Sequence, residues 1–120
     1  MKTREELKAE FKQMTPPMGV FHIKNTANGK VFIGSSSDLK AIWHRQKLQL
    51  DTGLHVNRDL QKDWTEQGMS HFVYEILEEI KPSNDPSFDV KKELQVLEAL
   101  YLEAVQPFGD KGYNVKKRSF

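Results

Sequence analysis

One carboxylate stands out among the side chains that could do chemistry in this sequence. Apolar residues recur at helical spacing through residues 89–105, and at about 100° per residue Glu98 lies beside that stripe, whereas Glu103 points away from it. A carboxylate at the margin of a buried stripe needs a hydrogen-bonding partner, a metal ion or a path to water. The residues alone leave all three open for Glu98.

Basic side chains offer a second kind of chemistry, because guanidinium and ammonium groups bind phosphate. In a helix predicted for residues 39–52, Arg45 lies about 60° from the inward-facing Ile42, so it either reaches back to a phosphate or stays a solvated arginine. The basic run at residues 116–118 contacts phosphates or is solvated in the same way.

Other residues with functional potential are better explained by structure. Trp43 and Trp64 could stack on bases, but their helical spacing with leucines favours a place in the core. His55 and Asn57 fit a loop residue and a helix cap better than catalytic groups.

The composition limits the class of protein. A chain of 120 residues and 13.9 kDa, with 38% hydrophobic residues, predicts one compact domain. The sequence has no cysteine, so disulfides and cysteine nucleophiles are excluded and a cytoplasmic location is expected. No apolar run approaches the ~18 residues of a membrane span. The net charge of +1 neither requires nor excludes a nucleic-acid partner.

The N-terminal segment is predicted to be separate from the domain that follows. Thr3 and Glu6 form a capping-box pattern that begins a helix over residues 3–14, and the two prolines that follow end it. We therefore expect an N-terminal helix and proline linker over residues 1–17 and a single domain over residues 18–120.

The order of elements indicates an α+β fold with a small three-stranded mixed or antiparallel sheet flanked by helices. Asn28-Gly29 predicts a tight turn, so the first two strands should form an antiparallel hairpin. The expected strands are 19–24, 31–34 and 71–77, and the expected helices of the domain are 39–52, 57–67 and 89–105.

Two short motifs point to a known family. Gly19-Val20-Phe21 and, after ten intervening residues, Phe32-Ile33-Gly34 resemble the paired strand motif of the GIY-YIG endonuclease superfamily. The resemblance covers about residues 18–115 and implies the fold expected from the elements. Further positions match in order: Gly29-Lys30-Val31, Asp38-Leu39, Gly53, His55, Asn57 and Tyr113-Asn114.

The resemblance implies phosphodiester cleavage with one divalent metal, Mg²⁺ or Mn²⁺, in which a tyrosine helps activate water, an arginine stabilises the phosphate and a glutamate holds the metal. Glu98 aligns with the metal ligand. Phe21 and Phe32 stand at the tyrosine positions, Ile42 at the arginine position, and Gln46 where a histidine or a similar polar residue is usual. Each change keeps bulk but removes a charge or a proton.

We therefore expect a GIY-YIG nuclease-like domain with a degenerate active site and a cleft that binds DNA, another nucleic acid or a phosphate-bearing ligand. The residues expected to border this cleft are Phe21, Phe32, Gln46, Glu98 and Asn114. The residues expected to contact nucleic acid are Lys30, Arg45, Asn114, Lys116 and Lys117.

Two alternatives stay open. The chain could be an active metal-dependent endonuclease in which Arg45 and a metal-bound hydroxide replace the lost groups. It could instead be a protein-interaction module whose apolar Leu7, Phe11 and Met14 dock on a protein partner or on a second copy in a homodimer.

Overall fold

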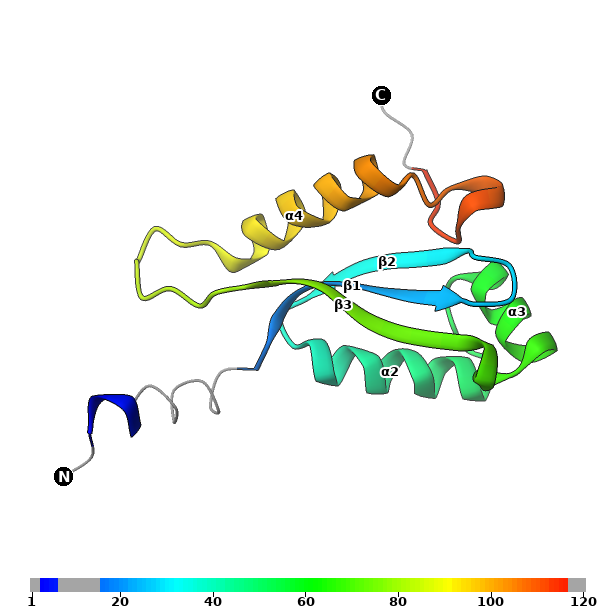
Figure 1. Ribbon diagram of the computed structural model, residues 1–120, viewed down its shortest axis with the longest axis horizontal. Helices are drawn as coiled ribbons and strands as arrows, with labels where there is room; N and C mark the ends of the chain where they lie inside the picture. The colour runs from blue at the N-terminus through cyan, green and yellow to red at the C-terminus, as the bar shows by residue number, and fades with distance from the viewer. Residues whose placement is uncertain (1–2, 7–15, 117–120) are drawn as a thin grey trace.

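The computed structural model describes residues 3–6 and 16–116. The elements are β1 (Met18–Asn25), β2 (Val31–Ser36), α2 (Leu39–Thr52), α3 (Arg58–Gln67), a 3-10 turn (Met69–His71), β3 (Phe72–Ile80), α4 (Val90–Val105) and a second 3-10 turn (Gly109–Lys111). The three strands form one antiparallel sheet in the order β2-β1-β3. Helices α2 and α4 lie on opposite faces of it (Figure 1). The predicted α+β class is confirmed.

The hairpin of β1 and β2 sets the positions of the motif residues. Gly29 in the turn has a φ of +78°, which glycine adopts without steric strain. The register pairs Phe21 with Gly34 and Ile23 with Phe32. The predicted antiparallel hairpin is confirmed, and it places one motif on the central strand and the other on an edge strand.

Strand β3 is longer than predicted and contains a bulge. It runs to Ile80 instead of ending near residue 77, and its register with β1 shifts between Val20 and Phe21. Leu77 is the extra residue on β3, and it packs on the α4 side of the sheet. A bulge exchanges the faces of the residues beyond it, so simple alternation along the sequence cannot follow the whole strand.

The helices of the domain begin at capping residues. The side chains of Asp38, Asn57 and Asp89 each accept a hydrogen bond, 3.0–3.2 Å long, from the backbone N–H three residues further on. Helix α2 ends at Gly53, which has the left-handed conformation typical of a helix end. The predicted boundaries of α2 and α3 therefore agree with the structure.

The N-terminal segment is described only in part. Oγ1 of Thr3 accepts a hydrogen bond of 3.2 Å from the N–H of Glu6, as the predicted capping box requires. Residues 7–14 of the predicted helix, which include its apolar stripe, lie outside the described residues. Within the described part of the chain, no helix has the length and apolar character needed to cross a membrane.

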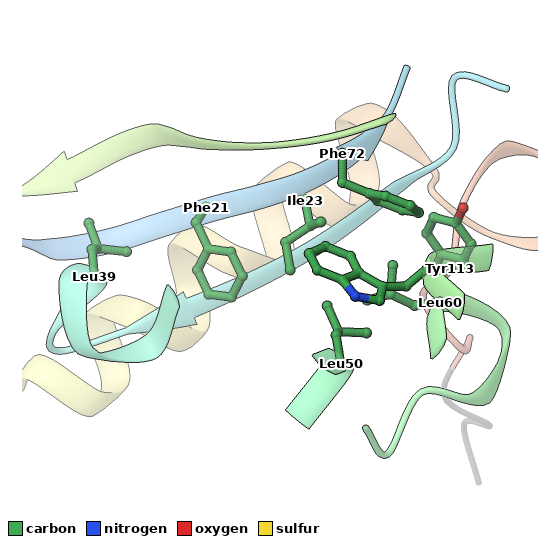
Figure 2. Packing of buried hydrophobic residues seen from close by; sticks show 8 residues of the cluster. Phe21, Ile23, Leu39, Leu50, Leu60, Phe72 and Tyr113 are labelled. Atoms are coloured by element: carbon green, nitrogen blue, oxygen red, sulfur yellow. The ribbon is translucent and has the colours of Figure 1, made fainter. Parts of the chain in front are cut away.

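Two hydrophobic clusters hold the sheet between the helices. The cluster on the α2 side, shown in Figure 2, consists of Phe21, Ile23, Leu39, Leu50, Leu60, Trp64, Phe72 and Tyr113. The cluster on the α4 side consists of Val20, Val31 and Ile33, covered by Leu77, Leu97, Tyr101 and Leu102. Trp43 stacks on Tyr74 with ring centroids 4.8 Å apart, so both tryptophans pack with the core as expected.

Replacing Gly19 by alanine should strongly destabilise the domain. A Cβ at residue 19 would lie 1.9 Å from the backbone oxygen of Glu78, so β1 and β3 would have to separate. We expect the free energy of unfolding to fall by ~3 kcal/mol in urea titrations. The matched control is Gly53→Ala, where φ is also positive but no atom lies within 4 Å, and where a loss of about 1–2 kcal/mol is expected. Equal losses in the two variants would contradict this account.

Candidate functional site

A cavity of about 760 Å³ opens along β2, the edge strand, where α2 and α4 approach from opposite faces of the sheet. Its lining comes from β1, β2, α2, α4 and the segment that follows α4. Six of the residues singled out in the sequence line this cavity: Phe21, Phe32, Ile42, Gln46, Glu98 and Asn114. The structure therefore brings together residues that are distant in the sequence.

The two motif phenylalanines reach the cavity from neighbouring strands. Side-chain alternation turns both Phe21 and Phe32 toward α2. The ring of Phe21 is 2% exposed, and a Cβ on Gly34 would come within 2.7 Å of its Cζ atom. The glycine of the second motif therefore leaves room for the tip of this ring.

A chain of hydrogen bonds orients the side chain of Gln46. The backbone N–H of Asn57 donates to Nδ1 of His55 (3.0 Å), so the neutral imidazole carries its proton on Nε2. This Nε2–H donates to Oε1 of Gln46, and the amide nitrogen of Gln46 is then the group left to donate to a ligand. Sequence reasoning treated His55 as a loop residue and missed this positioning role. Its place in the ordered series of family positions was the signal that could have found it.

The surroundings of His55 keep its ring neutral. The residue is 1% exposed, and its ring meets that of Phe32 edge-on with centroids 5.9 Å apart. Burial lowers the pKa of His55 below its ordinary value of 6.5. At neutral pH His55 therefore holds Gln46 in place without adding a positive charge to the site.

Glu98 supplies the charged side chain of the cavity lining. It is half-buried on α4, in agreement with the helical bearing calculated from the sequence. Among the described residues, no group of three or more histidine, aspartate or glutamate side chains is placed to hold a metal. A single carboxylate still fits Mg²⁺ or Mn²⁺, because such ions are often held by one or two carboxylates together with water and substrate phosphates.

The tyrosines of the chain do not replace the hydroxyl groups missing from the motifs. The sequence has three tyrosines, and each donates a hydrogen bond elsewhere: Tyr74 to a backbone oxygen of α2 (2.7 Å), Tyr101 to Glu78 (2.8 Å) and Tyr113 to Asp63 (2.6 Å). Burial raises the pKa of Tyr74 and of Tyr113 to about 12. None of these hydroxyls is positioned to activate water in the cavity.

Asn114 borders the cavity and also has a structural role that the sequence did not suggest. Its Oδ1 accepts a hydrogen bond from the N–H of Ile33, and its Nδ2 donates to the C=O of Ile33, both at 2.8 Å. The side chain thus pairs with the exposed backbone edge of β2, as a neighbouring strand would. Asn114 lines the cavity, and its amide holds the end of the chain against this strand, which leaves one N–H and one lone pair of the amide that β2 does not use.

Most of the predicted basic contacts lie outside the cavity lining. Arg45 is exposed on α2 and is not part of the lining, and Nζ of Lys30 lies 5.6 Å from the ring centroid of Tyr113. Lys116 lines an adjoining hollow of about 460 Å³ that shares three lining residues with the cavity. Lys117 lies outside the described residues. Lys116 therefore lines a hollow that adjoins the site.

The sequence is similar to that of a phage endonuclease. No family model matches it. It is 39% identical over 67 residues to intron-associated endonuclease 1 of Enterobacteria phage T4. The aligned region covers 56% of this chain and 27% of that protein. The chain therefore matches only about a quarter of the length of this relative.

Solved structures extend the similarity over most of the chain. The catalytic domain of intron endonuclease I-TevI aligns with a TM-score of 0.69 and 29% identity, covering 83% of this chain and 99% of that domain. A mutant of the same domain aligns with a TM-score of 0.70 and 29% identity, covering 87% and 98%. The similarity in fold thus extends beyond the two motifs and over most of the chain.

Lowering the pH should destabilise the domain through His55. Because the pKa of His55 in the folded chain lies below 6.5, the unfolded chain binds more protons just below that pH, and the free energy of unfolding falls there. This loss should be smaller in His55→Gln, whose amide can keep both hydrogen bonds without titrating. Urea unfolding at about pH 7 and about pH 5 measures the difference.

His44→Gln is the matched control for this experiment, since His44 is exposed on α2 and its loss should leave the wild-type pH dependence intact. If His55→Gln loses as much stability on acidification as the wild type, His55 is not the titrating group.

Proposed function

We propose that this chain, which is homologous to the T4 endonuclease and has the fold of the GIY-YIG endonuclease superfamily, binds nucleic acid at the β2 cavity but cleaves phosphodiesters poorly or not at all. The observation that supports this most strongly is the cavity lining. The four positions at which the family carries its reactive groups meet there, and they hold Phe21, Phe32, Ile42 and Gln46.

The lost groups are those on which the reaction depends. Hydrolysis needs a group that removes a proton from water, and neither phenylalanine ring has one. It also needs positive charge against the phosphate as negative charge develops, and Ile42 provides none. Gln46 offers a neutral amide, which binds a phosphate oxygen but transfers no proton.

The retained groups are suited to binding. His55 holds the side chain of Gln46 in place, and the amide nitrogen of Gln46 would donate to a phosphate oxygen. Glu98 would hold a divalent ion, which when bound supplies positive charge against phosphate oxygens. Lys116, which lines the adjoining hollow, would contact a phosphate further along the nucleic-acid strand.

The region of similarity favours recognition of the nucleic-acid backbone and not of a particular base sequence. The similarity to the T4 protein covers about a quarter of that protein, and the solved structures it matches are of a catalytic domain. In this domain, the described groups around the cavity are suited to phosphate and metal contacts. Such contacts fix position and affinity without reading bases.

Binding should be weak and sensitive to salt. We expect the affinity for fluorescein-labelled DNA and RNA, measured by fluorescence anisotropy with Mg²⁺, to fall as salt rises, because phosphate contacts release counterions. Lys116→Ala should weaken binding by ~threefold or more at low salt. Lys91→Ala is the matched control, since Lys91 is an exposed lysine on α4 outside the cavity lining. Affinity that is absent or independent of salt would refute the binding proposal.

Restoring the family residues should create cleavage. The variant with Phe21→Tyr, Phe32→Tyr, Ile42→Arg and Gln46→His is expected to nick supercoiled plasmid with Mg²⁺ at least ~10²-fold faster than the wild type. Adding Glu98→Ala to that variant should remove the gain, and urea unfolding checks that each variant is folded. Rapid cleavage by the wild type that Glu98→Ala abolishes would overturn the proposal in favour of an active endonuclease with a variant site.

A further inference from the structure

A separate hollow, of about 300 Å³, lies between the end of β3 and α4. We call it the α4 groove, and its lining residues are Glu78, Glu79, Ile80, Glu93, Val96, Leu97 and Leu100. It shares no lining residue with the β2 cavity. Val96 is 51% exposed and Leu100 is 61% exposed, so the groove presents an apolar strip to solvent with carboxylates around it.

The chemistry of the α4 groove suits a helix with an apolar face and basic residues beside it, because such a helix covers the apolar strip and pairs with the carboxylates. The N-terminal segment of the sequence has this pattern. Leu7, Phe11 and Met14 recur at helical spacing. Arg4, Lys8 and Lys12 follow at intervals of four and lie along one flank of that apolar stripe. Glu6 and Glu10 lie along the other flank.

The position of β1 brings the N-terminal segment close to a groove, but its direction leads away from the groove of its own domain. Met18 pairs with Ile80, so the segment leaves the sheet beside the groove lining. Each of the two prolines, Pro16 and Pro17, favours an extended backbone at the residue before it, which favours a course away from the domain. The described turn at residues 3–6 is exposed and lies apart from α4 (Figure 1, dark blue).

We propose that two copies of the chain associate by exchanging these segments, with the apolar stripe at residues 7–14 of each copy seated in the α4 groove of the other. Each copy offers one segment and one groove, so the exchange closes as a two-fold symmetric dimer. The β2 cavity stays open in both copies, because no residue of its lining is used. The exchange does not depend on the proposed nucleic-acid function, so an experiment can disprove the exchange while that function stands.

Sedimentation velocity of the full chain over a range of concentrations tests the exchange. The wild type should form a dimer, and Val96→Asp, in the groove, and Phe11→Asp, in the segment, should each shift the equilibrium to monomer by at least ~tenfold in dissociation constant. Leu48→Asp is the matched control: Leu48 is 64% exposed on α2, outside the groove, and its loss should leave the dimer intact. A wild type that stays monomeric at every concentration overturns the proposal.

Mixing the two monomeric variants distinguishes this exchange from a dimer that forms through any different surface. The Val96→Asp copy has an intact segment and the Phe11→Asp copy has an intact groove, so the mixture should form a mixed dimer through one contact. Circular dichroism checks that each variant is folded. If the mixture shows no association, or if either variant alone remains a dimer, the segment does not dock on a second copy.

Discussion

The close approach of β1 to its two neighbouring strands is the constraint on which the rest of the structure depends. On one side, Gly19 lets β1 lie against the backbone oxygen of Glu78. On the other, Gly34 lets the ring of Phe21 lie across β2. Successive side chains of β1 then enter opposite cores, with Val20 on the α4 side and Phe21 on the α2 side. One strand thereby anchors both layers of helices and fixes where the cavity opens.

The shape of the cavity and its reactivity are therefore separable. Packing against α2 needs the ring of Phe21, and a phenyl ring fills that space as a phenol ring does. Ile42 likewise packs against the core cluster from α2, where a charged group would need a partner or water. The fold therefore depends on the volume and register of these side chains and not on which acid–base groups the cavity carries.

Features that depend on local sequence were predictable, and those that depend on distant side chains were not. The hairpin turn at Gly29, the cap at Asp38 and the bearing of Glu98 follow from residues within a few positions of one another. The orientation of Gln46 depends on His55, nine residues away, and on a proton position that no spacing encodes. The spacing of Arg45 placed it on the correct helix but left open whether its side chain reaches the cavity, and in the structure it is exposed and outside the lining.

The pairing of Asn114 with Ile33 also bears on how this protein avoids forming aggregates. A sheet of three strands has two open edges, and each is a template on which a foreign strand can add. Along β2, an incoming strand would first have to displace an amide that already satisfies both backbone groups of Ile33. Along β3, the exposed carboxylates of Glu75, Glu78 and Glu79 make the other edge repel a second copy of itself. The two edges are thus protected by different means, the β2 edge by the hydrogen bonds of Asn114 and the β3 edge by charge. Ordered contacts between copies are therefore expected through helices and not through added strands.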